Sequence, residues 1–337
     1  MRRTTAIALL AALAIASCSD GGSSPTGAAG PTVGTGVTPL RVGLVTDARG
    51  LNDRGFNQAA ADALEQASEK LGVQTDVAET RADSDYIPAL QTLAEQHFDV
   101  VFAVGELLRD ATAKTAPLYP GTKFVLIDST VERPVKNLQS LVFKSEEAGY
   151  LAGVLAALTT KTGTIAAVGG RSIPEVNRYI AGYRAGAEAA KPDVEVLVDY
   201  ADDFVQPARC RTVALDQIAR GSDVVFQVAG DCGPGALAAA KAKKVWAIGS
   251  ESDQAYLGGR VLSSAVKKID VAVYKTIELA TRGQLAGGSQ TVFGVAEDGV
   301  GLGATSPDAP AGAVAKAKDA ASQVADGTVD VPDTLGR

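Results

Sequence analysis

Histidine and methionine are nearly absent from this sequence, which holds only one of each. The single histidine, His97, cannot form a histidine-rich metal site, because such a site needs several imidazole ligands. The scarcity of histidine also argues against a hydrolase in which a histidine base activates a serine or cysteine nucleophile. A Gly-x-Ser-x-Gly elbow, a Gly-Lys-Ser/Thr phosphate loop and a third glycine spaced after Gly169-Gly170 are missing as well. The sequence therefore predicts a protein that is not an enzyme and that needs no cofactor and no metal.

Aromatic residues and basic charge are also scarce. Aromatic side chains make up 5% of the chain, and 32 basic residues face 39 acidic ones, which gives a formal charge of −7. Nucleic-acid-binding domains are usually basic, so a nucleic-acid partner is disfavoured. The apolar fraction of 46% is ordinary for a globular protein, and 337 residues are enough for two domains with their own cores.

The beginning of the chain has the pattern of an export signal. Met1-Arg2-Arg3 precedes an apolar run from Ala6 to Ala16 and the small pair Ala16-Ser17. The run is too short to span a bilayer as a helix, which takes about 20 apolar residues, and no later stretch is long and apolar enough. Ile15-Ala16-Ser17-Cys18 resembles a bacterial lipobox, in which the chain is cut before the cysteine and the thiol takes a diacylglycerol.

We therefore expect residues 1–17 to be a signal peptide and Cys18 to carry the lipid, with fatty acids such as palmitate. Ordinary secretory cleavage beside an unmodified cysteine is the alternative. Residues 18–39 are rich in Gly, Ser, Thr, Pro and Ala, a composition typical of a flexible tether behind a lipid anchor. This places the protein at the extracytoplasmic face of the cell membrane, held by the lipid.

Cys210 and Cys232 remain as a pair once Cys18 is lipidated. An even pair of cysteines outside the cytoplasm favours a disulfide. The bond would close a loop of about 22 residues and contribute roughly 3 kcal/mol to the free energy of unfolding in the loop-entropy model. The alternative is two reduced, buried thiols.

Strand and helix patterns alternate along the chain in two series. The first series predicts strands over 41–46, 74–80, 100–104, 124–127 and 141–143, and helices over 57–71, 86–96, 109–116 and 146–159. The second series predicts strands over 164–168, 194–200, 223–228, 245–248 and 261–266, and helices over 174–190, 208–220, 235–243 and 269–282. A last strand pair over 290–295 and 299–302 and a helix over 311–325 complete the chain. Continuous apolar strands alternating with helices predict two α/β domains with parallel sheets.

Ligands of open parallel sheets bind beyond the carboxyl ends of the strands. The residues just after each predicted strand are therefore the candidate site. They are Asp47, Asn52, Asp53, Gly105, Glu106, Asp128, Gly169, Gly170, Gly230, Asp231 and Glu251.

Several segments spread over most of the chain have a familiar order and spacing. They are Asn52-Asp53-Arg54-Gly55-Phe56-Asn57, Glu147-Ala-Gly-Tyr-Leu-Ala-Gly153, the run from Gly169 to Gly186, Asp223 to Gly230, Ala247 to Gln254 and Leu262 to Tyr274. Together they resemble the basic membrane protein lipoproteins, substrate-binding components of ABC importers that are best known for purine nucleosides.

The resemblance implies a type I periplasmic-binding-protein fold with two doubly wound lobes joined by three hinge segments. We place the hinges near 143–145, 263–267 and 289–293, with residues 40–143 plus 267–290 in one lobe and 144–266 plus 291–328 in the other. Closure of the lobes would trap a solute and present a surface to the permease and its ATPase. We expect a monomer that binds a purine nucleoside. A sugar or another heterocycle such as a flavin is the alternative ligand, and an α/β hydrolase or phosphorylase the less favoured class.

Two phenylalanines are the candidate walls for a flat ligand. Phe56 precedes a helix directly, where stacking on a heterocycle would contribute roughly 1–3 kcal/mol; a hydrophobic staple is the alternative. Phe226, near the end of a strand in the other lobe, is the candidate second wall, with plain strand core as the alternative.

Polar groups would serve the edge of the base and the sugar. Asp47, Asp53 and Asn57 are candidates on the first lobe, with helix capping as the alternative for the last two. Glu251 stands where the family usually has Asp, and a carboxylate there would accept the ribose hydroxyls; Asp253 is the nearby alternative. Lys267 matches the family's cleft lysine, which would donate to the sugar or pair with one of these carboxylates. Gly105, Gly170 and Gly230 would let the backbone approach the ligand, or form tight turns.

Overall fold

A computed structural model describes residues 39–51 and 55–336, and Pro39–Arg337 forms one compact unit. The expected signal peptide, Cys18, the tether and Asp53 lie outside the described residues. Within the described part of the chain, no helix has the length and apolar character needed to cross a membrane.

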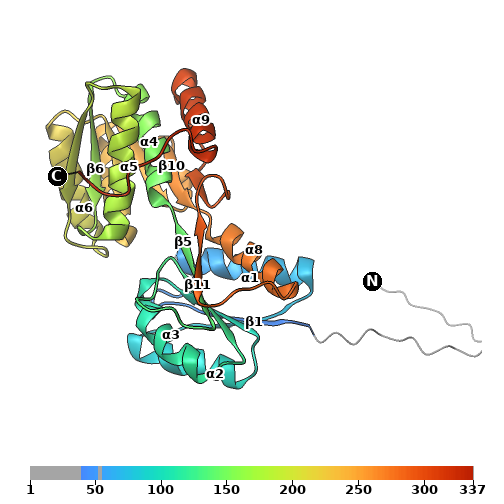
Figure 1. The fold of residues 1–337 in the computed structure, drawn as a ribbon. Helices are drawn as coiled ribbons and strands as arrows, with labels where there is room; N and C mark the ends of the chain where they lie inside the picture. Colours follow the sequence, from blue (N-terminus) through green and yellow to red (C-terminus); the bar gives the residue numbers. More distant parts are fainter. Residues whose placement is uncertain (1–38, 52–54, 337) are drawn as a thin grey trace, which may run out of the picture. The chain divides into compact units, whose positions relative to one another are not determined.

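The first sheet is parallel throughout, with strand order β11-β5-β4-β3-β1-β2. Its strands are β1 (Arg41–Val45), β2 (Gln74–Ala78), β3 (Val100–Val104), β4 (Lys123–Ile127), β5 (Leu138–Phe143) and β11 (Ser289–Phe293). Helices α1 (Phe56–Leu71) and α8 (Ile269–Thr281) cover one face, and α2 (Tyr86–Glu95) and α3 (Arg109–Thr115) the other (Figure 1). All five residues of β3 are buried, as expected of a strand covered on both faces.

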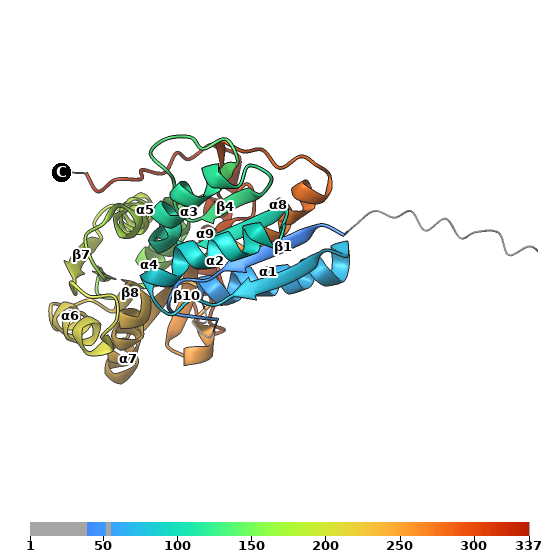
Figure 2. The ribbon, with the colours of Figure 1, turned by 90° about the horizontal axis from the view of Figure 1, so that it is seen from below.

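The second sheet has the order β12-β10-β9-β8-β6-β7. Its strands are β6 (Thr164–Gly169), β7 (Glu195–Tyr200), β8 (Val224–Val228), β9 (Trp246–Glu251), β10 (Val261–Lys267) and β12 (Val300–Leu302). Helices α6 (Pro207–Ala219) and α7 (Gly233–Lys243) lie together on one face (Figure 2), and α4 (Ser145–Thr159), α5 (Pro174–Ala190) and α9 (Ala311–Ala325) pack on the opposite side. Short 3₁₀ turns span Asp83–Asp85, Glu106–Leu108, Ala116–Leu118, Gly230–Cys232 and Ala255–Leu257. The predicted α/β fold with two doubly wound sheets is confirmed.

The expected last strand pair is wrong. β11 joins the first sheet as a parallel partner of β5, whereas β12 joins the second sheet as an antiparallel partner of β10. The apolar pattern of both segments predicted strands, but it carried no information about their partners. The two strands are separated because the chain changes sheet between Phe293 and Val300.

The chain passes from one sheet to the other after β5, after β10 and after β11. Backbone hydrogen bonds join the crossing segments to one another. The Lys144 N–H donates to the Phe293 carbonyl at 3.0 Å, and the Lys268 N–H donates to the Gly299 carbonyl at 2.8 Å. The Glu147 carboxylate also accepts the Val295 N–H at 2.6 Å. The crossings thus form one hydrogen-bonded bundle beside the carboxyl ends of both sheets.

Helices α4 and α5 approach so closely that only glycine fits between them. A Cβ on Gly149 would lie 2.1 Å from the backbone oxygen of Tyr179, and one on Gly182 would lie 1.9 Å from that of Glu146. Gly153 and Gly186 face similar barriers one turn further along each helix. Two of the segments on which the family resemblance rests therefore contain glycines that pack one helix against another.

Candidate functional site

The carboxyl ends of the two sheets meet at an ion pair. Lys267, the last residue of β10, donates from Nζ to Oδ2 of Asp128 at 2.7 Å, and Asp128 directly follows β4. The two side chains are 3% and 14% exposed. Burial raises the pKa of the Asp128 carboxyl, although the nearby Lys267 ammonium opposes that shift. A charged pair at this depth, joining one sheet to the other, marks the place where a ligand would contact both.

A cavity of about 320 Å³ opens beside this pair. Its lining is polar and mixes both signs of charge: Glu106, Arg109, Asp128, Glu175, Arg178 and Lys267 contribute, with Ser129, Thr130, Ser145 and Gln290 between them. The Ser129 hydroxyl donates to the Glu106 carboxylate, and Arg109 pairs with Glu106 and Asp110. Such a lining offers both donors and acceptors, which suits a ligand that carries several hydroxyl groups.

Phe56 begins α1 and borders the same region. The Lys267 ammonium nitrogen lies 5.4 Å from the centre of its ring, and the Arg49 guanidinium carbon lies 5.8 Å from it. Cations at these distances are attracted to the ring face. Phe56 is 7% exposed and packs into the apolar cluster around α1. The ring of Phe56 is therefore anchored in the core and at the same time borders the charged groups.

Asp47 and Asn57 lock the end of β1 to α1. The Asn57 side-chain N–H donates to Asp47 Oδ1 at 2.7 Å, and the Asp47 backbone N–H donates to Asn57 Oδ1 at 3.1 Å. Arg49 adds two contacts to Asp47 Oδ2, at 2.9 Å from Nε and 2.6 Å from Nη2. Burial would raise the pKa of Asp47, but hydrogen bonds from Arg49 and Asn57 outweigh it and leave that pKa below its usual range. Asn57 thus ties Asp47, at the end of β1, to the start of α1.

Phe204 is the aromatic residue that the sequence reasoning missed. It lies half-buried in the loop after β7, and its ring rests on Gly170, where a Cβ would lie 2.3 Å from the ring. A Cβ on Gly230 would lie 3.4 Å from the backbone oxygen of Phe204, and Arg171 lies 5.9 Å from the ring centre. The rule that ligands bind after strand ends would have found Phe204 if it had been applied to β7. Gly170 thus makes room for a side chain of the protein itself, whereas a Cβ on Gly230 would make only an ordinary contact.

Phe226 is placed differently from the expectation. It lies inside β8, is 0% exposed and packs against Tyr183 and Tyr179 at ring-centre distances of 4.9 and 6.2 Å. No face of the ring is open to a ligand in this structure, so the alternative of plain strand core describes it. The apolar run of β8 could not reveal this, because a buried strand and a strand that ends in a ligand wall have the same pattern.

The remaining predicted residues lie at strand ends. Glu251 ends β9 with a φ of 68° and is half-buried. Burial, followed by the charges of Glu251 and Asp128, raises the pKa of the buried Tyr179 phenol well above its usual value. Asp253 accepts the backbone N–H of Ala255 at 3.1 Å and of Ala304 at 2.9 Å, so it caps a turn.

Gly105 follows β3 with a φ of 85°, a left-handed conformation that favours glycine, and open space lies where its Cβ would be. It precedes Glu106, which lines the cavity. Gly105 therefore permits the turn that brings this carboxylate to the site.

Two solved structures of transporter solute-binding proteins have the same fold as this chain. An ABC transporter solute-binding protein from Aeropyrum pernix superimposes with a TM-score of 0.75 at 24% identity, over 88% of this chain and 94% of that one. A solute-binding protein of the same transporter type from Conexibacter woesei gives a TM-score of 0.75 at 22% identity, over 88% and 100% of the two chains. Both of these chains thus share the two-sheet α/β fold described above.

Residues 40–334 match the family model of PnrA-like ABC transporter substrate-binding proteins. Among similar curated proteins, the nucleoside-binding protein BmpA of Lactococcus lactis is 34% identical over 97% of each chain. A lipoprotein of Pyrococcus furiosus with no assigned role is 32% identical over 78% of this chain and 69% of that one. The chain belongs to the PnrA-like family of ABC transporter substrate-binding proteins, as the resemblance in the sequence predicted.

Proposed function

We propose that this protein captures a nucleoside, preferably a purine nucleoside, between its two sheets and delivers it to an ABC permease. The observation that carries the proposal is the ion pair of Lys267 with Asp128 beside the ring of Phe56. A nucleoside is a flat apolar base joined to a hydroxylated sugar. This region offers an aromatic ring for the first part and buried charged donors and acceptors for the second.

The base would stack on Phe56, and Phe204 takes the part of the second wall that the sequence assigned to Phe226. Both aromatic residues lie at the carboxyl ends of their sheets, Phe56 after β1 and Phe204 after β7. Stacking of a base on an aromatic side chain contributes roughly 1–3 kcal/mol. The Lys267 ammonium lies over Phe56. A bound base would take over that contact.

The sugar would lie toward Asp128, Lys267 and Glu251. Vicinal hydroxyls can donate to a carboxylate and accept from an ammonium group, and such charge-assisted bonds are stronger than neutral ones. The mixed charges of the 320 Å³ cavity support a hydroxylated, uncharged ligand. The same lining favours a free sugar as the second candidate, because the cavity wall itself carries a single aromatic residue, Phe143, among the residues that the structure describes.

The other parts of the proposal follow from the family and the chain. We place the two lobes at residues 40–143 with 268–293 and 144–267 with 294–328, which moves the expected boundaries at 266 and 290 to the ends of β10 and β11. Lobe closure would trap the ligand for the permease. Residues 1–17 are proposed as the signal peptide, Cys18 as the lipid anchor at the outer face of the membrane, and Cys210 with Cys232 as a disulfide in a monomeric protein.

Two experiments test the proposal. Mass spectrometry of the small molecule that co-purifies with the protein should find a nucleoside, and calorimetry should detect one molecule bound per chain. Titration with purine nucleosides, free bases and pentoses separates the candidates, since a nucleoside should bind more tightly than either of its parts. Tight binding of a pentose alone would favour the sugar, and conversion of a nucleoside to product would refute the assignment as a binding protein.

A further inference from the structure

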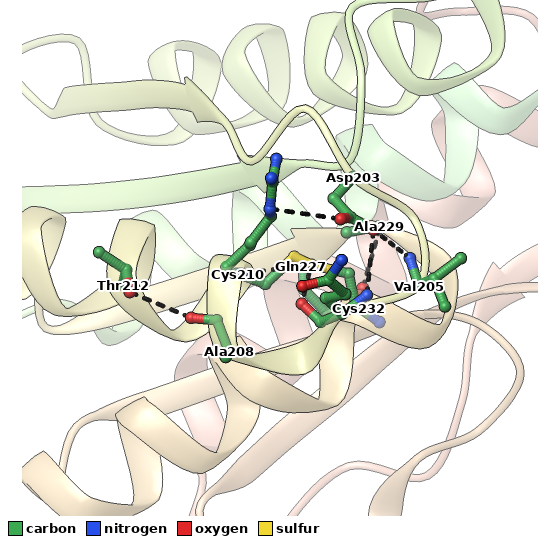
Figure 3. Close-up of a disulfide and its surroundings, with 10 residues drawn as sticks. Asp203, Val205, Ala208, Cys210, Thr212, Gln227, Ala229 and Cys232 are labelled. Carbon is green, nitrogen blue, oxygen red and sulfur yellow. Dashed lines mark hydrogen bonds and ion pairs between the residues drawn. A yellow bond between two sulfur atoms is a disulfide. The ribbon is translucent and has the colours of Figure 1, made fainter.

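The cysteine pair lies in the loops that carry the second aromatic wall. Cys210 is in the first turn of α6, and Cys232 ends the 3₁₀ turn after β8. Their Cα atoms are 5.6 Å apart, and Figure 3 shows the two sulfur atoms joined, with Asp203 and Val205 close by. Both residues are 0% exposed. A bond shielded from soluble thiols is a permanent cross-link and is poorly suited to act as a redox switch.

The Cys232 side of this cross-link is bonded directly to the residue that forms the wall. The Cys232 backbone N–H donates to the carbonyl of Phe204 at 3.0 Å. Asp203, the residue before Phe204, accepts the N–H groups of Val205 at 2.6 Å and Gln206 at 3.0 Å. The loop from Ala201 to Gln206 is therefore fastened on one side by its own carboxylate and on the other by the turn that contains Cys232.

Three strand ends converge on the Phe204 ring through these contacts. Gly170, after β6, lies under the ring, and the Asp203 N–H donates to the Gly170 carbonyl at 3.0 Å. Gly230, after β8, lies beside the Phe204 backbone. The cross-link joins the turn after β8 to the helix that follows the β7 loop, so it fixes the distance between two of the three segments.

We propose that the Cys210–Cys232 disulfide is a positioning element of the binding site, which holds Phe204 ready for a ligand before the ligand arrives. This rests on the proposed function for the identity of the ligand. A half-buried aromatic residue on a loop loses conformational freedom when it stacks on a ligand, and that loss weakens binding unless the loop is already ordered. The cross-link removes part of that freedom in advance.

The test is the double variant Cys210→Ala/Cys232→Ala, which removes both sulfur atoms of the pair. The control is Val324→Ala on α9, a buried residue on the face of the second sheet opposite α6. Calorimetry with a purine nucleoside is done at a temperature where circular dichroism shows all three proteins fully folded. We expect the dissociation constant of the double variant to rise roughly tenfold, from lost preorganisation, while that of the control stays within about twofold of the native value.

Amide hydrogen exchange of the ligand-free proteins gives a readout that does not depend on the ligand. The amides of Asp203, Val205 and Cys232 should exchange at least about tenfold faster in the double variant, with the β6 and β8 amides unchanged. Unchanged exchange in the loop, or equal loss of affinity in the control, would overturn the positioning role. If the native protein bound no nucleoside, the proposed function would fail, and the exchange experiment would still decide the role of the cross-link.

Discussion

Asp47 and Asp128 are buried carboxylates that follow strands of the same sheet, but they differ in where their partners come from and in the direction of their pKa shifts. Asp47, after β1, is held inside its own sheet by Arg49 and Asn57, and its pKa is lowered. Asp128, after β4, reaches across to Lys267 of the other sheet, and burial raises its pKa. The first carboxylate accepts hydrogen bonds from local donors and ties the end of β1 to α1. The second has a single ammonium partner that a ligand could share, so position after a strand does not by itself decide which carboxylate binds ligand.

The largest effect should come from breaking the bridge between the sheets. Lys267→Met removes the ammonium and leaves Asp128 buried without its partner, which should lower the free energy of unfolding at pH 7 by about 3–5 kcal/mol. The matched control is Lys268→Met, whose ammonium pairs with the exposed Asp298 and should matter by less than about 1 kcal/mol. Urea unfolding of both variants gives the comparison. An equal loss in the free energy of unfolding for both variants would show that the buried ion pair stabilises the protein no more than the exposed one.

The pH dependence of the Lys267→Met variant follows from the raised pKa of Asp128. A carboxyl whose pKa is higher in the folded than in the unfolded state binds protons more tightly when folded. Its contribution is therefore favourable below the unfolded pKa of about 3.9 and is lost as pH rises through the folded pKa. Without Lys267 that pKa should rise further. The deficit of the variant relative to the native protein should thus shrink as pH falls from 7 toward 4, and a deficit that grew would contradict the account.

Phe226 and Phe56, the two candidate walls expected from the sequence, offer a second comparison. Phe226→Ala empties a fully buried position and should lower the free energy of unfolding by about 3–5 kcal/mol, while the folded fraction keeps its nucleoside affinity.

Phe56→Ala should weaken nucleoside binding at least about tenfold through loss of the stacking surface. Calorimetry with equilibrium unfolding separates the two effects. An unchanged dissociation constant in Phe56→Ala would remove Phe56 from the site.

Asp47 should give the smallest effect and the opposite pH dependence. Asp47→Asn weakens the bonds to Arg49 and should cost about 1–3 kcal/mol at pH 7. The folded pKa of Asp47 lies below the unfolded value of about 3.9, so its contribution is present above that value and is lost as pH falls through the folded pKa. The native protein and Asp47→Asn should therefore converge in stability in acid. Divergence in acid would mean that the local lock is not what lowers this pKa.

Most of the fold could be predicted from the sequence because its signals are local. The residue pattern of each segment indicates whether it is a strand or a helix, and nearly all the expected elements are present within a few residues of their predicted bounds. The partners of β11 and β12 were not predictable, because strand pairing is settled by contacts between distant segments. The sequence indicated which residues lie near the site, but not which of them contact one another. Asp128 was a strand-end candidate, yet nothing local indicates that it meets Lys267, 139 residues further along the chain.

The same limit explains the aromatic residues. Phe56 stood out because it lies beside a recognisable turn, and Phe226 because it lies near the end of an apolar strand. Phe204 lies in a polar loop, and its packing on Gly170 at the end of β6 becomes visible only in the folded structure. Sequence patterns indicate the secondary structure of each segment. The face that a side chain presents to a ligand depends on neighbours that the pattern does not contain.

The most direct test is a crystal structure of the purified protein with a purine nucleoside bound. We predict that the base lies against Phe56, with Phe204 on its other side. The sugar hydroxyls should bond to Asp128 and Lys267, whose ammonium should have left the Phe56 ring. A nucleoside bound elsewhere, or a base that leaves Lys267 over Phe56 and contacts neither sheet end, would contradict it.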